Sequence, residues 1–261
     1  VVFTVADDKK NQEVSMIEIR MKANQYDETK ETYVEGAELE VRDLEGNVVD
    51  SWTTDGTFHY ISGLEIGNSY VLVETKAPKG FAIALPINFT VNEVNEDQEV
   101  VMVNKKVLAY KVDTEIKELA GAELSVLDVD GNVVDHWVSD GTAHAIEGLK
   151  VCETYTLVEV KAPEGYAIAS PITFKVADNA KNDEINLINK KVFVHKSDIT
   201  GEPELEGAKL TVLTLNGDTV DEWVSGSEPH PISNIKVGET YILREEIAPE
   251  GYVIASDVQF T

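Results

Sequence analysis

One phrase occurs three times in this chain of 261 residues, and it limits the folds that the chain can adopt. Each copy alternates apolar and polar residues and then reaches a Pro-x-Gly step, which is typical of a β-strand followed by a turn. The copies read YVLVETKAPKGFAIA at 70–84, YTLVEVKAPEGYAIA at 155–169 and YILREEIAPEGYVIA at 241–255. Their prolines, Pro78, Pro163 and Pro249, are 85 and 86 residues apart.

Other residues recur in the same register, which indicates that whole domains are repeated and not one strand alone. These residues are Gly36, Gly121 and Gly207, then Trp52, Trp137 and Trp223, then His59, His144 and His230. We therefore predict three tandem domains, namely repeat 1 at residues 20–105, repeat 2 at 106–191 and repeat 3 at 192–261.

The pattern within a repeat is all β. In repeat 2 we expect strands at 107–112 and 122–126, then a strand ending at Trp137, and further strands near His144 and at 155–159, 172–176 and 185–189. No helical period lies between these segments, which argues against a parallel α/β fold. Short strands with turn signals at this spacing, such as Asp130-Gly131, predict a β-sandwich.

Both ends of the chain align with the interior of a repeat. Residues 1–7 match 172–178, so residues 1–19 are expected to be the closing strands of a preceding repeat or a strand donated to another molecule. Repeat 3 is expected to lack its own last strand. Because an unpaired sheet edge is a template for strand addition, we hypothesise head-to-tail strand exchange between two copies of the chain.

The charge of the chain excludes several classes of partner. With 48 acidic and 22 basic residues its formal net charge is −26, a field that repels nucleic-acid phosphates and anionic membrane surfaces. No apolar run is long enough to span a membrane, and the residue spacing of a calcium-binding loop is missing. The one cysteine, Cys152, excludes an intrachain disulfide and stands where the other repeats have Gly67 and Gly238.

The recurring histidines and tryptophans favour a structural role. No second ligand recurs beside the histidines, and the chain has no glycine-rich phosphate loop and no Ser-His-Asp arrangement, so we expect neither a metal site nor a cofactor. The tryptophans are expected to anchor the core or the strand edges, because large aromatic side chains usually serve packing.

Three polar residues end apolar rows in repeat 2. Alternation places Lys111 on the face of Val107 and Ala109, Glu159 on that of Tyr155 and Leu157, and Asn189 on that of Ile185 and Leu187. All three are therefore expected in the core. Desolvation there favours a neutral amine, which is a nucleophile, and a protonated carboxyl, which can polarise an amide and move protons.

These motifs resemble the collagen-adhesin B-type, or SpaA-like, repeat of Gram-positive adhesins and pilins. The resemblance is carried by the lysine in Tyr-Lys-Val-Asp at 110–113, the phrase at 155–166, called the E-box, and the asparagine of the closing strand. It implies a transthyretin-like, or reverse immunoglobulin, sandwich. It also implies a self-formed isopeptide bond from Lys111, the nucleophile, to Asn189, which loses ammonia, with Glu159 as catalyst. The alternative is a buried salt bridge with a hydrogen-bonded asparagine.

The other repeats hold incomplete sets. Repeat 1 has Glu74 and Asn104, but Gln25 replaces the lysine, and the nearby Lys22 lies on the opposite face, so we expect no bond there. Repeat 3 has Lys196 and Glu245, but its asparagine strand would lie beyond Thr261.

The resemblance implies a structural stalk or fibre segment of a bacterial cell-wall adhesin or pilus, located outside the cell. The linkers from Asn104 to Lys111 and from Asn189 to Lys196 contain no Gly, Ser or Pro, so we expect little hinge freedom and a semi-rigid rod. The alternative function is an adhesin module whose loops near Trp137 or Trp223 contact host protein or glycan. An enzyme with an external substrate is not expected, because the reactive groups are buried and react once.

Overall fold

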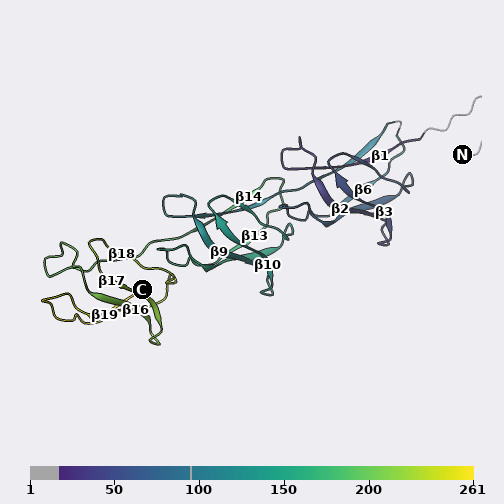
Figure 1. The fold of residues 1–261 in the computed structure, drawn as a ribbon. Coiled ribbons are helices and arrows are strands. Elements are labelled where there is room, and N and C mark those ends of the chain that lie inside the picture. Colours follow the sequence, from purple (N-terminus) through teal and green to yellow (C-terminus); the bar gives the residue numbers. More distant parts are fainter. Residues whose placement is uncertain (1–17, 95) are drawn as a thin grey trace, which may run out of the picture. The chain divides into compact units, whose positions relative to one another are not determined.

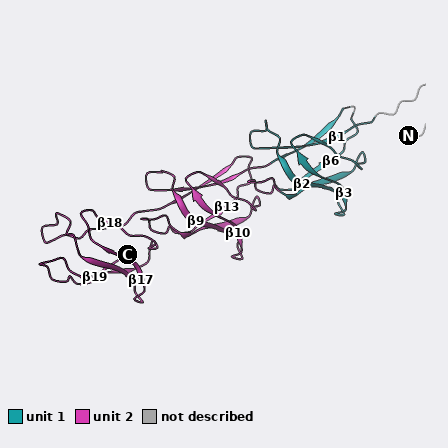
Figure 2. Ribbon diagram, viewed as in Figure 1, with its two compact units in different colours: residues 1–76, 85–103 teal, residues 77–84, 104–261 magenta. Residues whose placement is uncertain are grey.

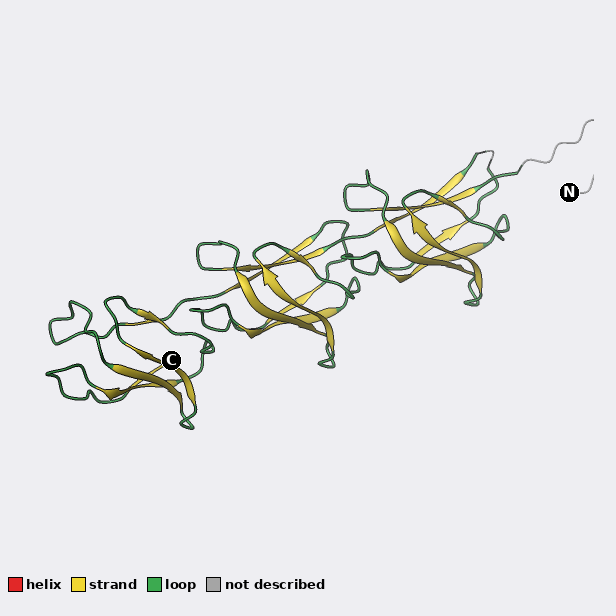
Figure 3. Ribbon diagram, viewed as in Figure 1, coloured by secondary structure: helices red, strands yellow, loops and turns green. Residues whose placement is uncertain are grey.

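The computed structural model describes residues 18–94 and 96–261 (Figure 1). Strands, turns and loops make up these residues, with no helix among them, which confirms the all-β prediction (Figure 3). The chain divides into two compact units, unit 1 with residues 1–76 and 85–103 and unit 2 with residues 77–84 and 104–261 (Figure 2). The expected closing strands at 1–19 lie, up to residue 17, outside the described residues.

Unit 1 contains two sheets. In the first, β1 (Met21–Tyr26) pairs antiparallel with β4 (His59–Tyr60) and parallel with β7 (Gln98–Val103). The second sheet is antiparallel, in the order β3 (Val48–Asp55), β2 (Glu35–Arg42), β5 (Ser69–Lys76) and β6 (Ile87–Thr90).

Repeat 2, in unit 2, has the same two sheets. Strand β8 (Val107–Val112) lies between β11 (His144–Ala145) and β14 (Asp183–Ile188). The second sheet has the order β10 (Val133–Asp140), β9 (Ala120–Leu127), β12 (Thr154–Lys161) and β13 (Ile172–Lys175). Several expected strand ends were wrong by one to three residues; for example, β10 continues past Trp137 to Asp140, and β14 ends one residue before Asn189.

The core of repeat 2 lies between these two sheets. Alternate residues of β8 and β14, including Ala109 and Leu187, pack in one cluster with alternate residues of β9 and β12, including Leu124 and Leu157. Each large apolar side chain buried in this way stabilises the fold by roughly 1.5–3 kcal/mol. The period-2 alternation seen in the sequence is therefore the pattern of a sandwich with one face of each sheet turned inward.

Repeat 3 also lies in unit 2. Strand β15 (Phe193–Val194) pairs with β18 (His230–Pro231). The larger sheet has the order β17 (Thr219–Val224), β16 (Lys209–Thr214), β19 (Tyr241–Ile247) and β20 (Val258–Phe260). Within the described part of the chain, β18 is the one strand paired with β15, whereas β8 in repeat 2 has two neighbours.

Cys152 occupies a turn that the other repeats build with glycine. Its φ is 70°, close to the 86° and 87° of Gly67 and Gly238, and the turn closes through the hydrogen bond from Glu153 N to Lys150 O. This left-handed conformation suits glycine and costs other residues energy. The substitution is therefore tolerated at a turn, and the Cys152 thiol is exposed there.

Candidate functional site

The first and last strands of repeat 2 place Lys111 and Asn189 beside each other. Strands β8 and β14 run parallel, with Lys111 opposite Leu187. The backbone N–H of Asn189 donates a hydrogen bond of 2.9 Å to Val112 O. Because alternate residues share a face, Asn189 lies on the same face of the sheet as Leu187. Asn189 comes two residues after Leu187, the residue opposite Lys111, so it lies diagonally across from the lysine. The long lysine side chain can span this diagonal.

Glu159 approaches from the other sheet, on β12. Its Oε1 lies 3.4 Å from Lys111 Nζ, and its Oε2 accepts a hydrogen bond of 2.7 Å from Asn189 Nδ2. The side chain of Lys111 is 2% exposed and that of Glu159 is 0% exposed, and Asn189 is fully buried. One carboxylate therefore contacts both the lysine and the asparagine in a site without access to solvent.

Backbone groups complete the site. Lys111 Nζ donates to Leu187 O at 2.9 Å, and Asn189 Nδ2 also donates to Ala167 O at 2.5 Å. The amide of Ala169 donates to Glu159 Oε2 at 2.6 Å. Both amide hydrogens of Asn189 are thus directed at acceptors, whereas its Oδ1 is buried without a hydrogen-bond donor. A buried unsatisfied carbonyl is costly, and such groups are often found where chemistry takes place.

Burial lowers the pKa of the Lys111 amine, although the negative charge of Glu159 opposes that effect. The cause is the loss of water around the charged ammonium. A lysine with a lowered pKa is more often neutral, and only the neutral amine can attack a carbonyl carbon.

The equivalent positions in unit 1 carry a different pair. Gln25 on β1 is buried and its Nε2 donates to Glu74 Oε1 at 2.6 Å. Lys22 is half-buried on the other face of β1, where its Nζ lies 5.4 Å from the ring centre of Phe58. Asn104 belongs to unit 2, where its Nδ2 donates to Ala82 O at 3.1 Å. A glutamine amide cannot act as the nucleophilic amine.

Repeat 3 brings its lysine and glutamate together. Lys196 Nζ lies 3.2 Å from Glu245 Oε1, with side chains 17% and 2% exposed, and the amide of Ala255 donates to Glu245 Oε2 at 2.6 Å. This pair repeats the geometry of Lys111 and Glu159, and the position that matches Asn189 would lie beyond Thr261.

Each recurring histidine has a recurring partner that sequence reasoning missed. His144 Nε2 lies 2.9 Å from Asp135 Oδ2, and its ring stacks on Trp137 with the centroids 4.0 Å apart. The same contacts join His59 and His230 to Asp50 and Asp221. The signal in the sequence was an aspartate two residues before each tryptophan. Among the described residues no cluster of three or more His, Cys, Asp or Glu could hold a metal ion.

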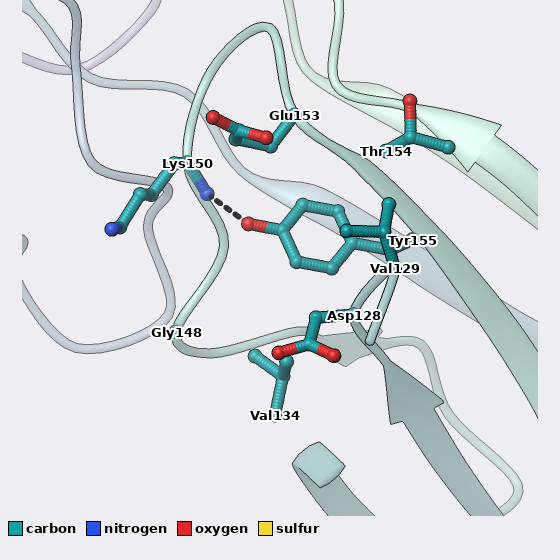
Figure 4. Close-up of a pocket in the computed structure, with 8 residues that line it drawn as sticks. All are labelled: Asp128, Val129, Val134, Gly148, Lys150, Glu153, Thr154 and Tyr155. Carbon is teal, nitrogen blue, oxygen red and sulfur yellow. Dashed lines mark hydrogen bonds between the residues drawn. The ribbon is translucent and has the colours of Figure 1, made fainter. Parts of the chain in front are cut away.

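An open hollow of about 370 Å³ lies at one end of repeat 2, lined by polar and apolar groups (Figure 4). Tyr155 points into it, and its hydroxyl accepts a hydrogen bond of 2.9 Å from the amide of Lys150. Repeat 1 has a similar hollow at Tyr70. Neither tryptophan that sequence reasoning considered as a ligand contact lines either hollow.

A family model described as the SpaA prealbumin-like fold domain matches the chain three times, at residues 19–106, 105–191 and 190–261. Together these matches cover nearly the whole sequence. No curated protein matches the chain. Among the described residues, no helix is long and apolar enough to cross a membrane.

Several solved structures are similar to this chain. The Bacillus anthracis TIE protein is 23% identical with a TM-score of 0.31, over 92% of this chain and 48% of that one, so the chain spans about half of its length. A streptococcal ancillary pilin is 17% identical with a TM-score of 0.32, over 93% of this chain and 94% of that one. The D295N mutant of the shaft pilin SpaA from Lactobacillus rhamnosus GG is 15% identical with a TM-score of 0.32, over 66% of this chain and 98% of that one.

Proposed function

The chain belongs to the family of SpaA prealbumin-like fold domains, and from this premise we propose that it is a structural segment of a bacterial cell-surface stalk or pilus fibre. Its second repeat is covalently closed by an isopeptide bond between Lys111 and Asn189. The observation that carries the proposal is the carboxylate of Glu159, which contacts Lys111 Nζ at 3.4 Å and Asn189 Nδ2 at 2.7 Å inside a buried site.

The reaction exchanges one amide for another. The neutral Nζ of Lys111 attacks Cγ of Asn189, the bond from Cγ to Nδ2 breaks, and the nitrogen leaves as ammonia. Glu159 accepts a proton from the attacking amine and delivers a proton to the leaving nitrogen, so that no other reactant is consumed. Holding the three groups in contact supplies the entropy that a bimolecular reaction would lose. The site reacts once, and we propose no external substrate.

The function of a stalk follows from where the bond lies in the chain. It would join the first strand of repeat 2, β8, to the residue that follows the last strand, β14. A pull on the two ends of the repeat then loads the covalent bond and not the hydrogen bonds between strands. Unlike a disulfide, an amide is not cleaved by reduction.

The intact mass of the purified chain, followed by peptide mapping, tests the proposal. We expect a deficit of one ammonia, with the peptides of Lys111 and Asn189 joined, because the other two repeats lack a complete set. The Glu159→Gln variant should keep the full mass, since glutamine cannot transfer protons. An unmodified wild-type mass would mean that the three residues form a buried polar cluster, and the covalent mechanism would be abandoned.

We further propose head-to-tail strand exchange between two copies, in which residues 1–19 of one chain pair with β15 of another. It is supported by the alignment of residues 1–7 with 172–178, which continued without a gap puts residues 12–17 at the position of β14, and by β15 having one strand neighbour in the described part of the chain. Sedimentation should show association that increases with concentration and disappears when residues 1–19 are deleted. A strictly monomeric wild-type chain at high concentration contradicts this exchange.

A further inference from the structure

The loop that follows strand β12 contacts both repeat 2 and repeat 3. Residues 162–169 continue the E-box phrase of repeat 2, yet the side chain of Ala167 is 2% exposed within the core cluster of repeat 3, with Val212, Ile232, Ile235 and Tyr241. The carbonyl of the same residue accepts the 2.5 Å hydrogen bond from Asn189 Nδ2. Ala167 therefore connects the core of repeat 3 with the acceptor group of repeat 2.

Repeat 3 holds the backbone on both sides of that carbonyl. The amide of Asn234 donates to Tyr166 O at 3.1 Å, the amide of Ile168 donates to Ile235 O at 2.7 Å, and the amide of Val237 donates to Ile168 O at 3.2 Å. The hydroxyl of Ser233 accepts a further bond of 2.8 Å from the amide of Gly165. With both neighbouring peptide groups bonded to repeat 3, the Ala167 carbonyl has little freedom to turn away from Asn189.

The same arrangement occurs a second time in unit 2. Ala82 is buried in the core cluster of repeat 2, Ile83 exchanges backbone hydrogen bonds with Leu149 and Val151, and the carbonyl of Ala82 accepts from Asn104 Nδ2. In each case an alanine enters the core of the following repeat while its carbonyl holds the closing asparagine of its own repeat. The same contacts between a loop, the closing asparagine and the core of the next repeat thus occur twice in unit 2.

In repeat 3 the equivalent loop packs against no further repeat among the described residues. Val253, at the position of Ala167, is 90% exposed. Even so, the amide of Ala255 still donates to Glu245. The bond from the loop to the glutamate therefore does not depend on docking. Docking adds the burial of position 167 and the hydrogen bonds on either side of its carbonyl.

We propose that repeat 3 accelerates isopeptide formation in repeat 2 by positioning the Ala167 carbonyl, which orients the amide of Asn189 toward Lys111 and Glu159. This inference rests on the proposed isopeptide bond and adds that its rate depends on the neighbouring repeat. The physical reason is that Asn189 Nδ2 needs both acceptors, Ala167 O and Glu159 Oε2, to fix the plane of its amide. An amide that rotates about its side-chain bonds presents Cγ to the lysine less often.

The test weakens the contact between the loop 162–169 and repeat 3 by changing residues of repeat 3 alone. The residues of the site, Lys111, Glu159 and Asn189, stay unchanged. Val237 precedes Gly238 in a turn closed by the hydrogen bond from Glu239 N to Lys236 O, and Gly238 has a φ of 87°. Proline is favoured at the position before such a glycine, so Val237→Pro keeps the turn and removes the donor to Ile168 O. Ser233→Ala removes the acceptor of Gly165 N. Loss of protection of the Ile168 amide in hydrogen exchange reports that this contact has opened.

Ile66→Pro is the matched control, because it makes the same change in the equivalent turn of repeat 1, where Gly67 has a φ of 86° and Ile66 is 52% exposed. Each chain is recovered unfolded in guanidinium and diluted to start folding. Tryptophan fluorescence follows folding, and intact mass follows the loss of ammonia. The two readouts separate slower folding from slower bond formation.

We expect the Val237→Pro/Ser233→Ala chain to fold normally and to lose ammonia more slowly by on the order of tenfold to a hundredfold, the cost of a misplaced reacting group. Ile66→Pro should match the wild type. Equal rates in the double variant, with the Ile168 amide unprotected, would overturn the inference and leave the isopeptide bond in place. A wild-type chain that never loses ammonia would remove the proposed function and this inference together.

Discussion

At the residue scale, the chemistry proposed for repeat 2 depends on a buried lysine and a buried glutamate that lie in contact. Lys111 and Glu159 are almost inaccessible to water, and burying such an ion pair gains little over an apolar replacement. Removal of one partner, in contrast, leaves an uncompensated charge and costs about 3–5 kcal/mol. The proposed isopeptide bond, in which the Lys111 amine would be consumed and Glu159 would act as catalyst, therefore explains the pair better than a gain in stability does.

The rate of bond formation should depend on pH through Lys111. Burial places the pKa of this amine below the ordinary value of about 10.4, so the neutral form becomes more populated as pH rises through the lowered pKa. We expect the rate of ammonia loss after dilution from guanidinium to rise with pH and then to level off. Intact mass at several pH values measures it, with fluorescence confirming folding at each. A rate that is greatest in acid contradicts a neutral lysine nucleophile.

At the element scale, an aspartate, a histidine and a tryptophan tie the two sheets of repeat 2 together. Asp135 and Trp137 lie on β10 and His144 lies on β11, which belongs to the other sheet. Asp135 Oδ2 also accepts a hydrogen bond of 2.9 Å from the amide of Glu147. Burial raises the pKa of Asp135, but the hydrogen bonds from His144 and Glu147 outweigh it, so the pKa of this carboxyl lies below its usual range.

Replacement of Asp135 should weaken the tie between the sheets. We expect Asp135→Ala to destabilise repeat 2 by about 1–3 kcal/mol near neutral pH, the cost of leaving buried donors unmatched. Because the folded-state pKa of Asp135 is lowered, its contribution is complete above the ordinary value of about 3.9 and is lost as pH falls through the lowered pKa. The difference between variant and parent should therefore shrink in acid.

Hydrogen exchange of repeat 2 peptides in urea measures the difference in stability between the Asp135→Ala variant and its parent. The parent carries Glu159→Gln, so that no covalent bond masks the unfolding of repeat 2. Asp130→Ala, a change at the exposed turn before Gly131, is the control. If both variants lose the same stability at neutral pH, the contact between Asp135 and His144 does not join the sheets.

At the scale of the whole molecule, the isopeptide bond would divide the chain into parts that can be extended by force and a part that cannot. With the bond in place, the residues between Lys111 and Asn189 would form a closed loop, and by analogy with disulfides such a closure would stabilise the fold by roughly 4–5 kcal/mol through the entropy of the unfolded chain. The mechanical effect is larger, because breaking a covalent bond is required before the loop can lengthen.

Pulling on the ends of single molecules should therefore extend repeats 1 and 3 but not repeat 2. The Glu159→Gln variant should add one further unfolding event, which releases roughly 25 nm of chain at about 3.4 Å per residue. If wild-type molecules show the same number of events as this variant, repeat 2 is not covalently closed.

Period-2 alternation was enough to predict much of this protein from its sequence. It identified the all-β repeats, the faces of β8 and β12, and the burial of Lys111, Glu159 and Asn189, because in a strand the side of each residue follows from its position alone. The same rule placed Gln25 inward and Lys22 on the other face of β1. The isopeptide bond itself stays a prediction.

The contacts between different elements could be read from the tertiary structure alone. The hydrogen bond from Asn189 to Ala167 O, the entry of Ala167 into the core of repeat 3 and the pairing of Asp135 with His144 join residues from different elements or repeats. Loop residues have no period that assigns them a side, and their conformation depends on the packing of the surfaces around them. Strand alternation in the sequence thus identifies which groups are buried in repeat 2, whereas the packing of repeats 2 and 3 positions the carbonyl that holds the asparagine among them.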